Sequence, residues 1–150
     1  MATQYTAGLT TGQVLTAATM NSIGAAWESY TPTLTQTGTV TKTVTYAKFC
    51  QINKLIVCNV RLDVTGAGTA TSAVVIGLPI TASQSSNLRI GTSTFFDSSA
   101  GITYNAAVQL VSSTTVSLLA DGGPNFVGVL PNVALAASDQ LTLSIQYEAA

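Results

Sequence analysis

The side chains of this sequence that could act as general acids or bases are its carboxylates, because the chain contains no His. The six acids are Glu28, Asp63, Asp97, Asp121, Asp139 and Glu148. Asp97, Asp121 and Asp139 lie in predicted turns, where Asp commonly accepts hydrogen bonds from its own backbone. The spacing of the acids matches no calcium-ligand set and indicates no paired glycosidase carboxylates. We therefore expect no enzymatic activity, no cofactor and no metal.

The two cysteines, Cys50 and Cys58, flank a predicted hairpin that turns at Asn53–Lys54, since Asn tolerates the positive φ of a tight turn. A two-residue turn pairs Ile52 with Leu55. This register places the two cysteines on opposite faces of the hairpin, where a disulfide is geometrically impossible. A three-residue turn would instead bring them face to face. We expect the two-residue turn and two reduced cysteines that serve as small apolar side chains.

The adjacent aromatic residues Phe95 and Phe96 form the remaining candidate site. Neighbouring side chains of a strand point to opposite faces, so one of the two rings should leave the core. We expect the outward ring to lie in a subunit interface. The alternative is an exposed platform that stacks against a sugar.

The composition is poor in charge and rich in hydroxyl groups. Five Lys and Arg oppose six Asp and Glu, whereas 24 Thr and 14 Ser make up about a quarter of the 150 residues. Five scattered cations are too few to neutralise a nucleic-acid backbone. Neutral polar groups are cheaper to desolvate than charges. The composition therefore favours a protein that packs against other protein subunits.

The apolar runs are too short for a membrane-spanning helix, and the first residues show no secretory signal. The longest runs, Leu55–Cys58 and Val74–Leu78, have the length of strands. We expect a protein without a membrane span that is made in a cytoplasm and kept there until it is assembled.

Residues 1–28 differ in pattern from the rest of the chain and predict an extended arm followed by a short helix from about Thr16 to Glu28. Met20, Ile23 and Trp27 form an apolar stripe on this helix. The stripe could cap the chain's own β core, pack against copies of itself about a three-fold axis, or dock on a different protein. The residues expected to take part in anchoring or oligomerisation are Leu15, Met20, Ile23, Trp27 and Tyr30.

From Tyr30 onwards the apolar residues alternate with polar ones, which is the pattern of half-buried strands. Each run places alternate residues on its apolar face. These are the even-numbered residues in Val40–Tyr46, Ile56–Val64 and Tyr104–Leu110, and the odd-numbered residues in Leu141–Tyr147. Turn signals separate the runs every 8–14 residues or so. The pattern predicts an all-β antiparallel sandwich or jelly roll of eight or nine strands in residues 29–150, preceded by the arm and helix of residues 1–28.

Several short segments resemble tailed-bacteriophage virion proteins. Gln13–Asn21 resembles a segment near the start of many tail and fibre proteins, and Ala26–Leu34 looks like the opening of small β modules in virion proteins. Tyr46–Val57 is similar to the first hairpin of that module, with Asn53 where the family usually has Gly. Gly77–Pro79 and Ser138–Ala149 are similar to its later segments.

The resemblance covers nearly the whole chain and implies a non-enzymatic structural protein of a phage virion. It implies a homotrimer at the particle surface, either a capsid decoration or head fibre or a short minor tail protein, with the N-terminal arm as anchor and the β-sandwich displayed outward. The expected partners are further copies of the chain and other virion proteins of the capsid or tail. The alternative function is a carbohydrate-binding adhesion module at the tail tip that contacts host surface glycans through Phe95 or Phe96.

Overall fold

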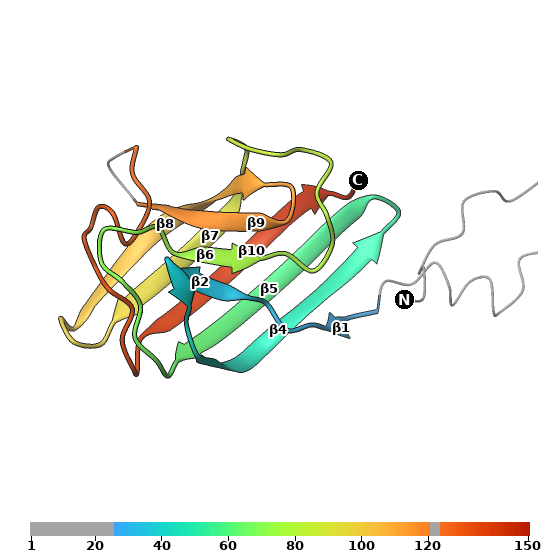
Figure 1. Cartoon of the computed structure of the whole chain (residues 1–150). Helices are drawn as coiled ribbons and strands as arrows, with labels where there is room; N and C mark the ends of the chain where they lie inside the picture. Colours follow the sequence, from blue (N-terminus) through green and yellow to red (C-terminus); the bar gives the residue numbers. More distant parts are fainter. Residues whose placement is uncertain (1–25, 121–123) are drawn as a thin grey trace, which may run out of the picture.

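The computed structural model describes residues 26–120 and 124–150 (Figure 1), and this part of the chain consists of strands and loops without a helix. The strands are β1 (Glu28–Ser29), β2 (Leu34–Gln36), β3 (Gly38–Thr39), β4 (Lys42–Ile52), β5 (Leu55–Val64), β6 (Val75–Gly77), β7 (Arg89–Asp97), β8 (Ile102–Ser112), β9 (Thr115–Ala120) and β10 (Gln140–Glu148). The predicted all-β class is confirmed. No helix in the described residues could cross a membrane.

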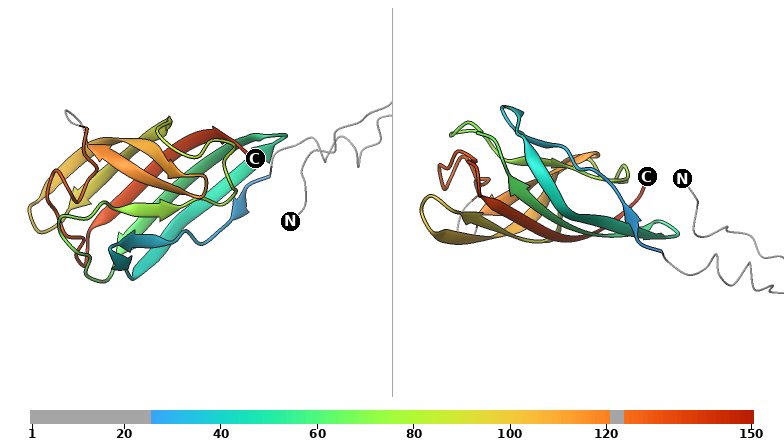
Figure 2. Two further views of the ribbon diagram at one scale, coloured as in Figure 1. Left: turned by 45° about the horizontal axis from the view of Figure 1, so that its top comes forward. Right: turned by 90° about the horizontal axis from the view of Figure 1, so that it is seen from below.

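All ten strands belong to a single antiparallel sheet in the order β1-β4-β5-β10-β7-β8-β9-β6-β2-β3. The sheet curls so that the shorter strands β9, β6 and β2 lie over the long strands β4, β5, β10, β7 and β8 (Figures 1 and 2). The prediction of a two-sheet sandwich or jelly roll is not confirmed. Hydrogen-bonded ladders continue from β8 through β9 and β6 to β2, so the two layers remain parts of one sheet.

The hydrophobic core lies on the inner face of this curled sheet, between the long and the short strands. The alternation predicted for residues 56–64, 104–110 and 141–147 is confirmed, because the residues placed on the apolar face are buried, or half-buried in the case of Tyr104. The largest fully buried side chains include Phe95, Leu34, Ile56, Leu62, Ile76, Leu110, Leu118, Leu135, Leu141 and Ile145.

A β-bulge interrupts the alternation predicted for residues 40–46. The β4–β5 register shifts between Val44 and Tyr46, so Thr45 is the extra residue of β4. Val44 packs against the core, whereas Tyr46 is 42% exposed. The prediction that these two side chains share a face is therefore wrong, because an inserted residue reverses the orientation of every side chain that follows.

The β4–β5 hairpin has the predicted two-residue turn. Ile52 pairs with Leu55, and Asn53 adopts a φ of 54°. Cys50 pairs with Val57, and Cys58 pairs with Phe49, so the two cysteines lie on opposite faces. Both are buried and free, as predicted.

The predicted N-terminal helix ended at Glu28, but the structure places this residue in a strand. Glu28 and Ser29 pair with Phe49 and Lys48 of β4, and neither Ala26 nor Trp27 is helical. The sheet domain thus begins at Glu28 rather than at residue 29, because the edge of β4 offers backbone groups for pairing. The rest of the predicted helix and the arm lie outside the described residues.

Candidate functional site

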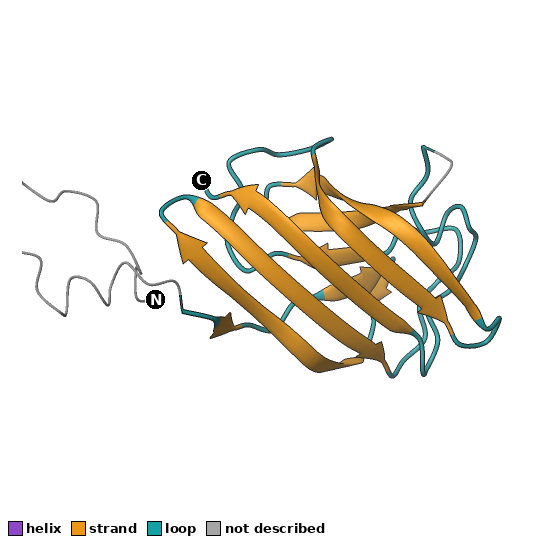
Figure 3. Ribbon diagram, turned by 180° about the vertical axis from the view of Figure 1, so that it is seen from behind, coloured by secondary structure: helices purple, strands orange, loops and turns teal. Residues whose placement is uncertain are grey.

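The outer face of the long strands, opposite the core, is an open surface of the described domain. Figure 3 shows it without any described segment crossing in front of β4, β5, β10, β7 and β8. The register places the side chains of alternating residues on it, such as Tyr46 and Arg61 in one row with Thr142, Thr94 and Asn105. A candidate site on this protein is therefore an open surface rather than a deep cleft.

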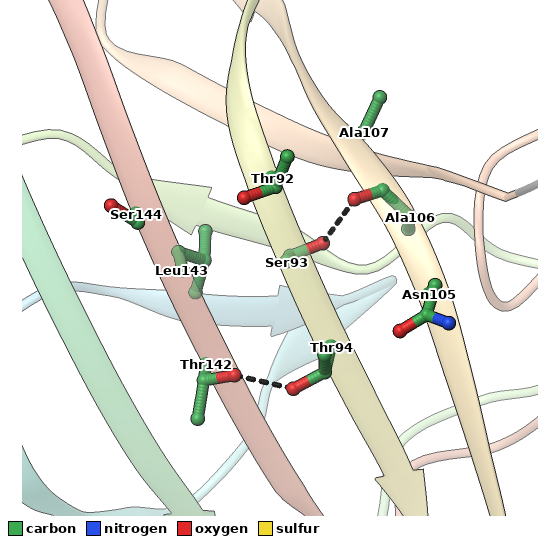
Figure 4. A pocket seen from close by; sticks show the side chains of 9 residues that line it. All are labelled: Thr92, Ser93, Thr94, Asn105, Ala106, Ala107, Thr142, Leu143 and Ser144. Carbon is green, nitrogen blue, oxygen red and sulfur yellow. Dashed lines mark hydrogen bonds between the residues drawn. The ribbon is translucent and has the colours of Figure 1, made fainter.

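An open hollow of about 560 Å³ lies on this outer face over β10, β7 and β8. Figure 4 shows the lining residues on three neighbouring strands, with a hydrogen bond between the Thr94 and Thr142 hydroxyls. The lining residues are Thr92, Ser93, Thr94, Asn105, Ala106, Ala107, Thr142, Leu143 and Ser144. None of them carries a charge.

The hollow follows from short side chains at the centre of the face. Thr92 pairs with Ala107 and Ser144, and Thr94 pairs with Asn105 and Thr142. A longer side chain flanks the hollow in the same row, where Arg61 pairs with Thr142. The hydroxyls and the Asn105 amide can donate and accept hydrogen bonds without the desolvation cost of a charge. This surface can therefore contact neutral polar groups of a ligand or another protein.

The described carboxylates are engaged in structural interactions. Asp97 Oδ1 accepts hydrogen bonds from the backbone N–H groups of Ser99 at 3.0 Å and Ala100 at 3.1 Å. Asp139 is buried and accepts hydrogen bonds from the backbone N–H groups of Ser98 and Ala136, both at 2.9 Å. The predicted turn roles of Asp97 and Asp139 are thus confirmed, while Asp121 lies outside the described residues.

The two carboxylates that form ion pairs, Asp63 and Glu148, lie near opposite ends of the β5–β10 ladder. Asp63 is 3.4 Å from Arg61 Nε and accepts a hydrogen bond from Thr45. Glu148 is 4.0 Å from Lys54 Nζ. Within the described part of the chain, no three His, Cys, Asp or Glu residues form a group that could hold a metal ion.

Phe95 and Phe96 point to opposite faces, as predicted. Phe95 is fully buried and stacks on Tyr104 with ring centroids 5.8 Å apart, so it cannot contact a ligand or another subunit. Phe96 is half-buried on the outer face, where it pairs with Gln140 and Thr103 one row beyond the hollow. Of the two rings, Phe96 is the one available for contact.

Tyr30 packs against the core of the sheet domain. Its ring meets Phe49 edge-on at 5.9 Å, and its hydroxyl lies 3.3 Å from Cys58 Sγ. Burial raises the pKa of the Cys58 thiol to about 11, although the hydrogen bond with Tyr30 opposes this shift. Burial also raises the pKa of Tyr30. Cys58 therefore stays protonated and unreactive at neutral pH.

Trp27, by contrast, is 46% exposed next to β1, at the end of the domain where the β4–β5 hairpin turns. Leu15, Met20 and Ile23 lie outside the described residues. The sequence analysis missed the pairing of Thr92 and Thr94 with Thr142 and Ser144. The signals available were the run of hydroxyl residues Thr92–Thr94 and the alternation of Thr142 and Ser144 with apolar residues, but only the sheet order brings these strands together.

Comparisons of the chain with protein-family models, curated proteins and solved structures find no match. The function of the protein is therefore inferred from the geometry of the described domain and from the short sequence resemblances.

The two adjacent phenylalanines should respond very differently to truncation. Phe95→Ala leaves a cavity in the core and should lower the free energy of unfolding by about 3–5 kcal/mol. Phe96→Ala removes a half-buried ring and should cost about 1–2 kcal/mol. Urea denaturation at one fixed protein concentration measures both values, and equal losses would contradict the assignment of faces.

Proposed function

We propose that the protein is a non-enzymatic structural component of a tailed-phage virion. It forms a homotrimer at the particle surface, as a capsid decoration or head fibre or as a short minor tail protein. The N-terminal arm provides the anchor, and the β domain is displayed outward. The protein is made in the cytoplasm of the host bacterium and functions on the particle.

The observation that carries this proposal is the broad outer face, with uncharged polar side chains over β10, β7 and β8, of a domain joined at one end to the N-terminal segment. The described chain begins at the end of the sheet that also holds the β4–β5 turn and the C-terminus (Figures 1 and 3). An anchor attached there leaves the outer face and the opposite end of the sheet accessible. Neutral hydroxyl and amide groups can face either solvent or a neighbouring subunit at little desolvation cost.

The engagement of the described carboxylates supports a non-enzymatic role. Asp97 and Asp139 hold turns together through backbone hydrogen bonds, and Asp63 and Glu148 lie beside cations on different parts of the sheet. General acid–base catalysis needs such groups to converge on one reacting centre. The resemblance of Gln13–Asn21 and Ala26–Leu34 to phage segments supplies the assignment to a virion.

The full chain should sediment as a trimer. We expect analytical ultracentrifugation at micromolar concentrations to give a single species of three times the protomer mass, because the charge-poor surface offers little repulsion between copies. A chain that remains monomeric throughout this range would contradict the self-assembly part of the proposal.

Removing residues 1–25 should separate attachment from folding. This truncation retains Glu28 and Ser29 of β1, so the β domain should keep its far-ultraviolet circular dichroism, while binding to particles lacking the protein should be lost. The full chain is the control in the same co-sedimentation assay with purified particles. Equal binding by the truncated protein would refute the anchor.

The hollow favours a second candidate function, a carbohydrate-binding adhesion module at the tail tip. Sugars bind to neutral hydrogen-bonding groups beside an aromatic ring. Here Asn105, Thr94 and Thr142 lie one row from Phe96, and Thr92 and Ser144 lie in the row beyond. The openness of the hollow is suited to weak contact with neutral host surface glycans.

A glycan array followed by calorimetry tests this second candidate. We expect millimolar binding to a neutral oligosaccharide, weakened about fivefold or more by Asn105→Ala or Phe96→Ala. Gln84→Ala, in a loop outside the hollow, is the matched control and should leave the affinity unchanged. Failure of every neutral glycan to bind at millimolar concentration would exclude this function.

A further inference from the structure

A cluster of apolar side chains lies on the outer face where the β4–β5 hairpin turns. The ladder pairs Ile52 with Leu55 and Cys50 with Val57 on this face, and Trp27 directly precedes the strand that pairs with Phe49. We call these five residues (Trp27, Cys50, Ile52, Leu55 and Val57) the outer apolar surface. Ile52 is 47% exposed, Trp27 46% and Leu55 45%, so each of these three large side chains meets solvent.

The outer apolar surface is distinct from the rest of the outer face. The next row of the ladder holds Lys48 and Asn59, and the same row continues through Ser144 and Thr92 of the hollow. Cys50 is buried, yet the register places it on the outer face, and it does not belong to the core cluster of the inner face. Contiguous apolar side chains of this kind on an otherwise polar sheet commonly mark a protein–protein contact.

The attachment point of the N-terminal segment indicates which partner meets this surface. The 25 residues that precede the described chain join it at Ala26, next to Trp27. If three copies are held together through these segments, the parts of each domain nearest to the attachment points are brought to high effective concentration. The β4–β5 turn lies at this end of the sheet (Figure 3), and Ile52 and Leu55 flank it.

The charges beside the surface are compatible with contact between identical copies. Lys54 and Glu148 lie at its border, 4.0 Å apart, with side chains 61% and 60% exposed. A border that carries one cation and one anion is self-complementary, because the Lys of one copy can meet the Glu of the next about a rotation axis. Like charges therefore do not oppose the contact.

We propose that the outer apolar surface is covered by neighbouring copies of this chain, so that the β domain itself contributes to the trimer contact. This inference rests on the trimer proposed above and assigns its interface. It places Trp27, Ile52 and Leu55 near the trimer axis, and it leaves the hollow on β10, β7 and β8 outside the contact.

The intrinsic fluorescence of Trp27 tests which partner covers the surface, because Trp27 is the only Trp of the chain. The full chain is diluted from concentrations at which it is a trimer to those at which it dissociates. We expect the emission to shift to longer wavelength and acrylamide quenching to increase in step with dissociation measured by sedimentation. Covering by residues 1–25 of the same chain would make both signals independent of concentration and would overturn the proposal.

Charge substitutions supply the second measurement. Ile52→Glu and Leu55→Glu should each weaken trimer association by about tenfold or more, because they place a carboxylate in an apolar contact. Ile102→Glu is the matched control, since Ile102 is 46% exposed and begins β8 at the opposite end of the sheet. Circular dichroism of each variant confirms folding.

The outcomes separate this inference from the proposed function. A full chain that is trimeric with Trp27 equally quenched before and after dissociation refutes the assigned interface while the trimer stands. If the Ile52→Glu and Leu55→Glu variants fold and form trimers as strongly as the unsubstituted chain, the assigned interface is likewise refuted while the trimer stands. A full chain that is monomeric at every concentration refutes the trimer itself, and the interface with it.

Discussion

The pairing of β10 between β5 and β7 is the interaction on which the rest of the structure depends. Residues 140–148 pair with β5 along their whole length, and residues 140–145 pair with β7. The last strand of the chain is therefore central in the sheet, whereas the first described strand lies at its edge. Without β10 the β4–β5 hairpin would lose its connection to the β7–β8 hairpin, and the core between the long and short strands could not close.

The same strand determines the character of both faces. Its odd-numbered residues, from Leu141 to Tyr147, are buried in the core, and its even-numbered residues point outward. Two of these, Thr142 and Ser144, meet Thr94 and Thr92 of β7 in the register and form the hollow. A neutral polar outer face is thus the direct counterpart of an apolar inner face, because the side chains of a strand alternate between them.

The outer face is nevertheless divided into two kinds of surface along the strands. Around the β4–β5 turn its side chains are apolar, and over β10, β7 and β8 they are small and polar. The N-terminal segment joins the domain beside the apolar part, whereas the hollow lies over β10, β7 and β8. The two parts are therefore suited to different roles. Contact between copies fits the first, and contact with solvent or an external ligand fits the second.

The alternation of apolar and polar residues in 56–64, 104–110 and 141–147 sufficed to predict the all-β class and the core residues of three strands, because it reflects the local side-chain period. The two-residue turn at Asn53–Lys54 was predictable from the turn chemistry of Asn. The separation of Phe95 from Phe96 was predictable for the same reason, but which ring is buried was not. The bulge at Thr45, the strand at Glu28 and the hollow arise from pairing between residues distant in sequence. The sequence by itself therefore determined a charge-poor, hydroxyl-rich chain of alternating strands. Only the tertiary structure decided that these strands form one curled sheet with two different parts on its outer face. The reason is that strand order and register depend on long-range pairing, which no local pattern encodes.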